Sequence, residues 1–180
     1  MARPRIVRSG SLRLLVPDDL FSPVDAGVPV VRGSRVRVRM PKELPHASPG
    51  FYVATSNREF GSSDETDIVR LYWNVSPAGA VALTRLLTRH LNDQDLSFRL
   101  KALADPAEYH RCDSLVLYLR TEDLDSAWSG LERLYDVSAA ELGSVSPVFT
   151  KRLAPGLGLA EDPPGRDSFG LHRCGVLARG

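Results

Sequence analysis

Three cationic side chains lie on or beside short strand-like segments in the middle of this chain. Arg70 belongs to VRLYWNV, Lys101 belongs to SFRLKAL, and Arg111 comes shortly before SLVLYLR. A sheet face that carries several cations suits an anion, and phosphate first of all, because Arg and Lys form strong charge-assisted hydrogen bonds with phosphate oxygens. Tyr72 and Tyr118 lie in the same segments and can donate protons in such a pocket.

Lysine is rare in this chain, since Lys42, Lys101 and Lys151 stand against 20 arginines. A lysine can lose its proton when it is desolvated or lies near other cations, whereas an arginine effectively cannot. A lysine kept among strand-borne arginines is therefore a candidate base. The alternative interpretation, for each lysine, is an ordinary surface residue in contact with solvent.

The tripeptide HRC occurs twice, at residues 110–112 and 172–174. On a strand, residues two apart share a face, so each His-x-Cys pair can point in one direction. Zinc binding is one interpretation, but the spacing matches no common zinc motif, and we predict no metal site. In the competing interpretation the cysteines point into the core and Arg111 and Arg173 point outward. A Cys–His nucleophile is also conceivable, without an evident third group.

The central stretch predicts strand, helix, strand and strand. VRLYWNV alternates and predicts a strand. Ser76 followed by Pro77 is typical of a helix start. SFRLKAL and SLVLYLR then predict two short strands. The predicted apolar stripe of the helix consists of Val81, Leu83, Leu86, Leu87 and Leu91.

The flanking segments carry their own signals. SLRLLV and SRVRVRM (34–40) predict strands, and GFYVAT (50–55) predicts a strand that pairs with SRVRVRM as a hairpin. Asp123 is expected to cap a second helix, and SAAE (138–141) fits a capping box. GLGLAEDPPG lacks the signature of a phosphate-binding loop and predicts an ordinary loop. SFGLHRCGVLARG predicts a final strand.

Together these elements predict an α+β fold: a single domain with a mostly antiparallel twisted sheet and a few helices packed on it. Residues 1–66 would supply N-terminal strands and loops, and residues 67–180 the core. A net charge of +1 argues against bulk nucleic-acid binding. No apolar run is long enough for a membrane helix, no signal peptide is evident, and two cysteines favour the cytoplasm.

The second part of the chain resembles a known family. The segments VRLYWNVSPAGA, LTRHLND, SFRLKAL, YHRCDSLVLYL, SPVFTKRLAPGLGLAEDP and SFGLHRCGVLA look like a HopA-type type III effector domain. HopA-like domains also occur as lyases in class V lanthipeptide and thioamitide biosynthesis. There they eliminate phosphate from Ser and Thr residues that a kinase-like protein has phosphorylated. A more distant likeness is to the phosphothreonine lyases of bacterial effectors.

The resemblance to phosphothreonine lyases implies roles for individual residues. Lys101 matches the lysine base of that family, and Arg111 matches a phosphate ligand. Tyr118 lies in a strand that resembles one carrying a tyrosine. Arg70 replaces a lysine, and Tyr72 stands where that family has its histidine acid.

From this comparison we expect Tyr72 to be the acid, with His110 or His172 as the alternatives. The expected phosphate-binding residues are Arg70, Arg111, Arg173, Lys151 and Arg166. The reaction implied by the resemblance needs no cofactor. Its partners would be a phosphorylated precursor peptide and a kinase-like protein, and the chain could form a heteromeric complex with the kinase-like protein. Two other functions stay open: a non-catalytic module that binds the precursor or the kinase, and an effector that binds a host protein.

Overall fold

The structure, a computed structural model, describes residues 4–10, 12–45, 47–58, 67–163 and 168–179. By contacts the chain divides into two compact units, Met1–Pro41 and Lys42–Gly180. The division predicted from the sequence lies at residue 66 instead and stays a prediction. The α+β class with a mostly antiparallel sheet and packed helices is confirmed.

The first unit contains two small antiparallel sheets. One pairs β1 (Arg5–Ser9) with β2 (Leu12–Val16), and the other pairs β3 (Phe21–Pro23) with β4 (Val36–Val38). The predicted strand at 34–40 is therefore present in a shorter form. Its predicted hairpin partner is wrong, because β4 pairs with β3 and the segment 50–55 belongs to the other sheet.

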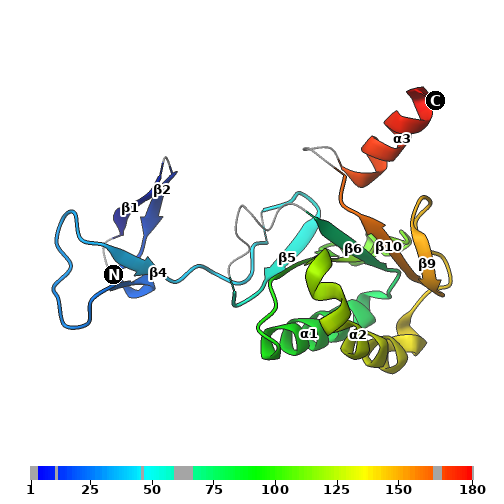
Figure 1. Ribbon diagram of the computed structural model, residues 1–180, viewed down its shortest axis with the longest axis horizontal. Helices are drawn as coiled ribbons and strands as arrows, with labels where there is room; N and C mark the ends of the chain where they lie inside the picture. The colour runs from blue at the N-terminus through cyan, green and yellow to red at the C-terminus, as the bar shows by residue number, and fades with distance from the viewer. Residues whose placement is uncertain (1–3, 11, 46, 59–66, 164–167, 180) are drawn as a thin grey trace. The chain divides into compact units, whose positions relative to one another are not determined.

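The second unit is built on a six-stranded sheet in the order β5-β7-β8-β6-β10-β9, in which every neighbouring pair is antiparallel (Figure 1). The strands are β5 (Phe51–Thr55), β6 (Ile68–Trp73), β7 (Phe98–Leu103), β8 (Leu115–Arg120), β9 (Lys151–Ala154) and β10 (Leu157–Glu161). The three strands predicted in the central stretch are thus confirmed, and they lie side by side.

Two helices cover one face of this sheet (Figure 1). Helix α1 (Pro77–Asp93) begins as predicted, since the Ser76 side chain accepts a hydrogen bond from the backbone N–H of Gly79. Helix α2 (Leu124–Ser138) packs beside it. Leu83, Leu87 and Leu91 are fully buried, but Val81 is 67% exposed, so that member of the predicted stripe is wrong. No helix within the described residues is long and apolar enough to cross a bilayer.

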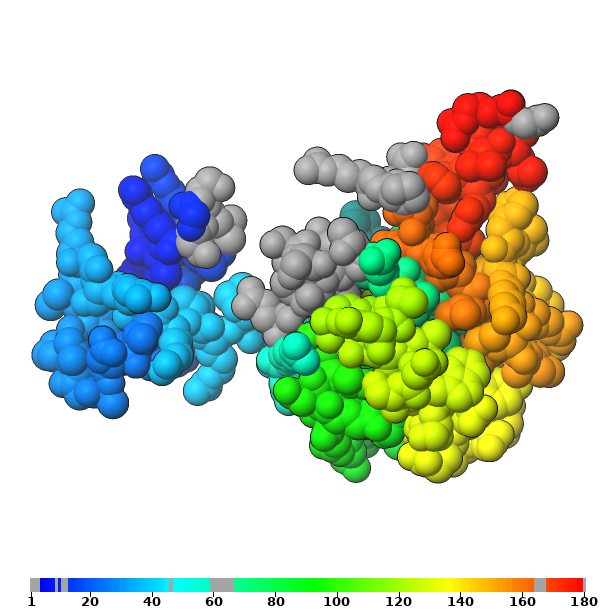
Figure 2. Space-filling model, viewed as in Figure 1, coloured from blue at the N-terminus to red at the C-terminus, as the bar shows by residue number. Residues whose placement is uncertain are grey.

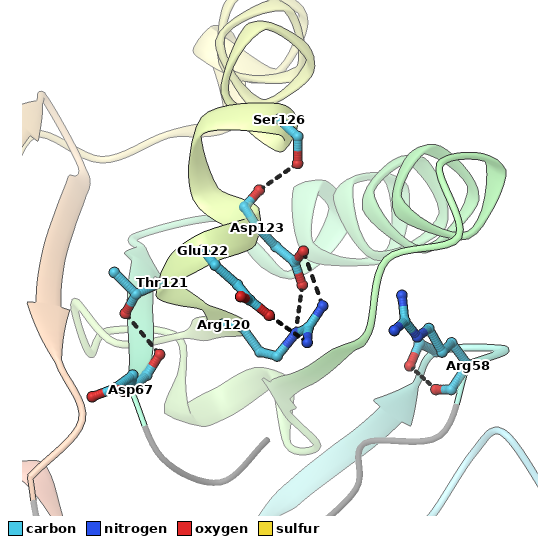
Figure 3. A network of polar contacts seen from close by, with 8 residues as sticks. Arg58, Asp67, Arg120, Thr121, Glu122, Asp123 and Ser126 are labelled. Carbon is cyan, nitrogen blue, oxygen red and sulfur yellow. Dashed lines mark hydrogen bonds and ion pairs between the residues drawn. The ribbon is translucent and has the colours of Figure 1, made fainter. Parts of the chain in front are cut away.

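The start of α2 differs from the expected cap. The Asp123 side chain makes no capping hydrogen bond; instead its carboxylate accepts two from Arg120, at 2.8 and 3.1 Å. Figure 3 shows this network, in which Thr121 also donates a hydrogen bond to the backbone oxygen of Asp67, the residue before β6. Arg120 therefore ties the end of β8 to α2. The expected capping box is likewise absent at Ser138, where no side-chain cap forms.

The C-terminal segments differ most from expectation. GLGLAEDPPG was expected to be a loop, but its first half forms β10, which pairs with β6 on one side and β9 on the other. The predicted final strand is wrong, because its residues form helix α3 (Phe169–Arg179). Figure 2 shows α3 in red at the edge of the second unit, with much of its surface turned outward. Leu171 and Leu177 are 63% and 64% exposed.

Candidate functional site: the polar face of the sheet

Alternate residues of the three central strands project away from α1 and α2, because side chains alternate across a strand. We call these residues the polar face: Arg99 and Lys101 on β7, Val116 and Tyr118 on β8, and Arg70 and Tyr72 on β6. The register places Tyr118 between Arg99 and Arg70. It places Val116 between Lys101 and Tyr72 in the next row. Three predicted site residues, Lys101 on β7 and Arg70 and Tyr72 on β6, thus meet on one surface.

The Lys101 ammonium group lies among aromatic rings. Its Nζ is 5.7 Å from the centroid of the Tyr118 ring and 6.0 Å from that of Phe51. It also donates a long hydrogen bond of 3.5 Å to the Ser48 hydroxyl. Faces of aromatic rings attract a cation, but they do not take up its proton. The amine is therefore held in place by weak contacts.

The electrostatic surroundings of Lys101 favour its neutral form. Burial lowers the pKa of Lys101, and the charges of Arg99 and Arg70 lower it further, while the Asp162 carboxylate acts in the opposite direction. Burial and like charges both disfavour an ammonium ion. A larger fraction of Lys101 is then neutral amine at a given pH, which is the form that accepts a proton.

Arg70 is held by three neighbours. Its Nε and Nη2 contact Oδ1 of Asp162, which follows β10. Its Cζ lies 5.1 Å from the centroid of the Tyr118 ring, and its Nη1 donates a hydrogen bond of 3.4 Å to the Tyr72 hydroxyl. The Asp162 carboxylate therefore partly compensates the charge of the Arg70 guanidinium, and this guanidinium holds the Tyr72 hydroxyl in position.

Tyr72 is the buried acid candidate. It is 5% exposed, and its ring centroid lies 5.5 Å from that of Phe169 on α3. Burial raises the pKa of Tyr72 to about 12, although the hydrogen bond and charge of Arg70 act against this rise. A phenol in these surroundings keeps its proton at neutral pH and is available as a donor. Burial also raises the pKa of Tyr118.

Helix α3 contacts this surface through Phe169 and carries two further candidates, His172 and Arg173. Phe169, its one buried residue among those described, lies with its ring 6.0 Å from Cζ of Arg70 and 5.2 Å from Cζ of Arg173. Nδ1 of His172 and Nε of Arg173 are buried without a hydrogen-bond partner in the described part of the chain. Buried polar atoms normally have partners, so these two nitrogen atoms are suited to a ligand.

Arg111 lies at the margin of the polar face. Its Nε and Nη2 donate hydrogen bonds of 2.9 and 2.8 Å to the two carboxylate oxygens of Asp113. Its Cζ is 5.7 Å from the centroid of Phe51, the same ring that Lys101 contacts. Lys101 and Arg111 therefore both contact the Phe51 ring. The Arg111 guanidinium is already bound to the Asp113 carboxylate.

Other predicted residues are placed elsewhere. His110 is exposed, with its Nδ1 3.1 Å from the backbone oxygen of Ala107. Lys151 is exposed on the edge strand β9, where the register pairs it with Leu159 of the helix-covered face. Arg166 lies outside the described residues.

Neither HRC segment lies on a strand. The first occupies the turn between Pro106–Glu108 and β8, and the second lies within α3. The geometric argument that sent both cysteines into a core is therefore wrong, and Cys174 is exposed. Among the described residues, no three or more His, Cys, Asp or Glu side chains form a group able to hold a metal ion.

Sequence reasoning missed four residues of the site. Arg99 was not among the predicted site residues, although it lies two positions before Lys101 on a strand and so shares its face. That signal was available in the sequence. Asp162, Phe51 and Phe169 carried no comparable signal, since each reaches the polar face through a strand pairing or a helix placement that is distant in sequence.

A groove of about 710 Å³ lies on the other side of the sheet, between α1 and the β5 edge. Tyr52, Ala54, Thr84 and Arg85 are among its lining residues. It contains none of the polar-face residues. The candidate acid, the candidate base and the neighbouring cationic groups all lie on the polar face.

Residues 42–180 match the HopA1 effector protein family. The fold is similar to the effector protein from Pseudomonas syringae pv. tomato strain DC3000, with a TM-score of 0.55 and 23% identity, over 71% of this chain and 50% of that one. It is also similar to the effector protein from Pseudomonas syringae pv. syringae strain 61, with a TM-score of 0.50 and 22% identity, over 66% and 47%. No curated protein matches the chain.

The chain spans about half the length of the two effector proteins of known structure. At this identity the structural likeness shows the fold alone. The family match is broader, because it covers the whole second unit, including every strand of the polar face. The chain belongs to the HopA1 effector protein family.

Proposed function

We propose that this protein is a phosphoserine/phosphothreonine lyase that acts on a phosphorylated precursor peptide. The observation that carries the proposal is the placement of Lys101. This lysine shares one sheet face with Arg70 and Tyr72, and burial together with neighbouring arginines lowers its pKa. Elimination of phosphate needs a base, an acid and cations arranged around one centre, and this face offers all three.

In the proposed reaction the neutral Lys101 amine takes the Cα proton of the phosphorylated residue. The Cα–H electron pair forms the new C=C bond, and the Cβ–O bond breaks. The Tyr72 hydroxyl gives its proton to the departing phosphate oxygen, with His172 as the second candidate for this step. The products are dehydroalanine or dehydrobutyrine and inorganic phosphate. The step is redox-neutral, so it needs no oxidant, reductant or organic cofactor.

Phosphate recognition would be shared among several cations. Arg173 and His172 have buried nitrogen atoms without a partner in the described residues, and these can donate to phosphate oxygens. Arg70 and Arg111 are closer to the central strands, but each is bound to a carboxylate. A phosphate entering the site would have to share these guanidinium groups with Asp162 and Asp113.

The biological setting follows the family resemblance. We propose that the substrate is a ribosomally made precursor of a lanthipeptide or thioamitide, phosphorylated by a kinase-like protein that forms a complex with this chain in the cytoplasm. Neither nucleic acid nor a membrane is part of the proposal. Lys151 and Arg166 remain secondary candidates for phosphate binding.

A second function is favoured by a specific observation. The carboxylates of Asp162 and Asp113 already occupy the guanidinium groups of Arg70 and Arg111. Such pairing weakens an anion site, because a charged partner must be displaced before phosphate binds. A module that binds the precursor or the kinase without catalysis fits this feature. Both similar structures are described as effector proteins, so binding of a host protein is a further form of this second candidate.

Mass spectrometry of phosphopeptides tests the proposal. The purified protein, alone and with a co-encoded kinase-like protein, is incubated with phosphoserine and phosphothreonine peptides. We expect loss of phosphoric acid, with the new alkene confirmed by thiol addition. In Lys101→Ala and Lys101→Arg, the rate should fall by about 10²–10⁴-fold, because no neutral amine remains to take the proton.

The matched control is Arg133→Ala on α2, an exposed cation outside the polar face. Its elimination rate should equal that of the unmodified protein. If phosphopeptides bind but stay intact in every combination, the binding module replaces the lyase. If Lys101→Ala weakens phosphopeptide binding while the rate at saturation is unchanged, Lys101 is a phosphate ligand and not the base.

A further inference from the structure

The β1–β2 hairpin of the first unit has an outer face with an unusual composition. The register places Ile6 opposite Leu15 and Arg8 opposite Arg13, and side chains two residues apart on a strand share a side. We call these four residues the hairpin face. Ile6 and Leu15 are each 68% exposed, and both arginines are exposed. An apolar pair thus lies next to a pair of like charges.

On the opposite side of the same hairpin, the side chains have partners within the first unit. Arg5 forms an ion pair of 2.9 Å with Asp18 and lies 5.4 Å from the centroid of the Phe21 ring. Val16 on this side is 4% exposed. The side chains of Arg8 and Arg13, in contrast, have no hydrogen bond or ion pair to any residue that the structure describes.

Arg8 and Arg13 are also an unfavourable pair. Like charges directly opposite each other in an antiparallel pair are destabilising. The exposed Ile6–Leu15 pair adds apolar surface that gains from being covered. A partner that supplies both carboxylates and an apolar side chain would relieve both features at once.

The charge distribution of the chain favours an acidic partner. Residues 1–41 contain eight arginines and three aspartates, for a net charge of +5, while residues 42–180 contain 15 cationic and 19 acidic residues, for −4. Phe21 is the only aromatic residue in positions 1–41. Single-stranded nucleic acids are usually held by several stacked aromatic side chains, so an acidic peptide suits this unit better.

We propose that the hairpin face is a docking surface for an extended acidic peptide segment. An apolar side chain of that segment covers Ile6 and Leu15, and its carboxylates pair with Arg8 and Arg13. This inference goes beyond the proposed function, because it concerns the unit outside the family match and requires no phosphate.

Fluorescence anisotropy with the full chain tests this docking surface. The probe is a fluorescein-labelled eight-residue peptide that repeats leucine, threonine, glutamate and threonine. Binding is measured at about 50 mM salt to limit screening of charges. We expect binding that falls at least about tenfold in Arg8→Glu/Arg13→Glu, since both charge pairs become repulsive. The matched control, Arg32→Glu/Arg35→Glu, makes the same charge change at exposed positions of the same unit and should stay within about threefold.

Several outcomes would overturn the inference. Equal loss in both double variants would mean that net charge alone attracts the probe. Undiminished binding of a peptide with glutamine in place of glutamate would remove the charge argument, and no binding at all would remove the surface. Tighter binding of an oligothymidylate would make the unit a nucleic-acid module. Because the probe carries no phosphate, an absence of lyase activity would leave this result unaffected.

Discussion

The two faces of the six-stranded sheet are made by the same strands but differ in almost every physical property. On the helix-covered face, Leu71, Leu100 and Leu117 are completely buried among apolar residues of α1 and α2. On the polar face, the adjacent residues Arg70 and Lys101 are only partly covered. The first face provides stability through burial, and the second keeps titratable groups at the intermediate depth where their pKa values shift.

This difference explains how the polar face tolerates charge. A buried charge is costly unless it is paired, and Arg70 meets that condition through Asp162 and the Tyr118 ring. Lys101 forms no ion pair or hydrogen bond with a carboxylate of the described residues. Its burial and the neighbouring arginines lower its pKa. One sheet face therefore contains both a cation paired with a carboxylate and a cation whose pKa is lowered.

The largest expected effect on stability comes from truncating the helix-covered face. Leu117→Ala should lower the free energy of unfolding by about 3 kcal/mol, because it leaves a cavity between the sheet and the helices. The neighbouring polar-face change Tyr118→Phe should cost less than about 1 kcal/mol. Urea denaturation measures both. Equal losses would show that the polar face is as tightly packed as the core.

An intermediate effect is expected where α1 meets α2 above the covered face. A Cβ at Gly130 would lie 1.7 Å from Nε2 of His90, a buried atom without a partner in the described residues. Gly130→Ala should therefore cost about 2 kcal/mol, although alanine favours a helix.

The companion change His90→Ala removes the obstacle at this contact. In that background Gly130→Ala should be neutral or stabilising, and a double-mutant cycle by thermal or urea denaturation should show strong coupling between the two positions. Simple additivity of the two changes would mean that the helices separate easily and that the covered face is less rigid than we infer.

The smallest effect concerns the pH dependence of the polar face. Tyr72 has a pKa of about 12 in the folded protein, above the ordinary value of 10. Between these pH values the unfolded chain loses a proton that the folded chain keeps, so stability falls as pH rises from about 10 to 12. Tyr72→Phe should remove about 1 kcal/mol of this loss at pH 11. Parallel denaturation curves at pH 8 and 11 measure the difference, and an unchanged pH dependence would refute this burial effect.

Local patterns predicted much of the second unit. Alternation in VRLYWNV correctly predicted a strand, SFRLKAL and SLVLYLR were correctly predicted as short strands, and the pair Ser76–Pro77 correctly predicted the start of α1. The same reasoning failed for the final segment, which forms helix α3 and not the predicted strand. A short segment with few apolar residues is compatible with either element. The reasoning also failed for Asp123, whose carboxylate binds Arg120 and does not cap the helix.

The sequence by itself determined which side of each strand carries Arg70, Lys101 and Tyr118, because a strand has a period of two that any register must respect. Only the tertiary structure decided that β8 lies between β7 and β6, so that these side chains meet. It also decided that Asp162 binds Arg70 and that Phe169 covers Tyr72. These contacts depend on which strands pair and where a helix packs, and such long-range choices leave no local pattern in the chain.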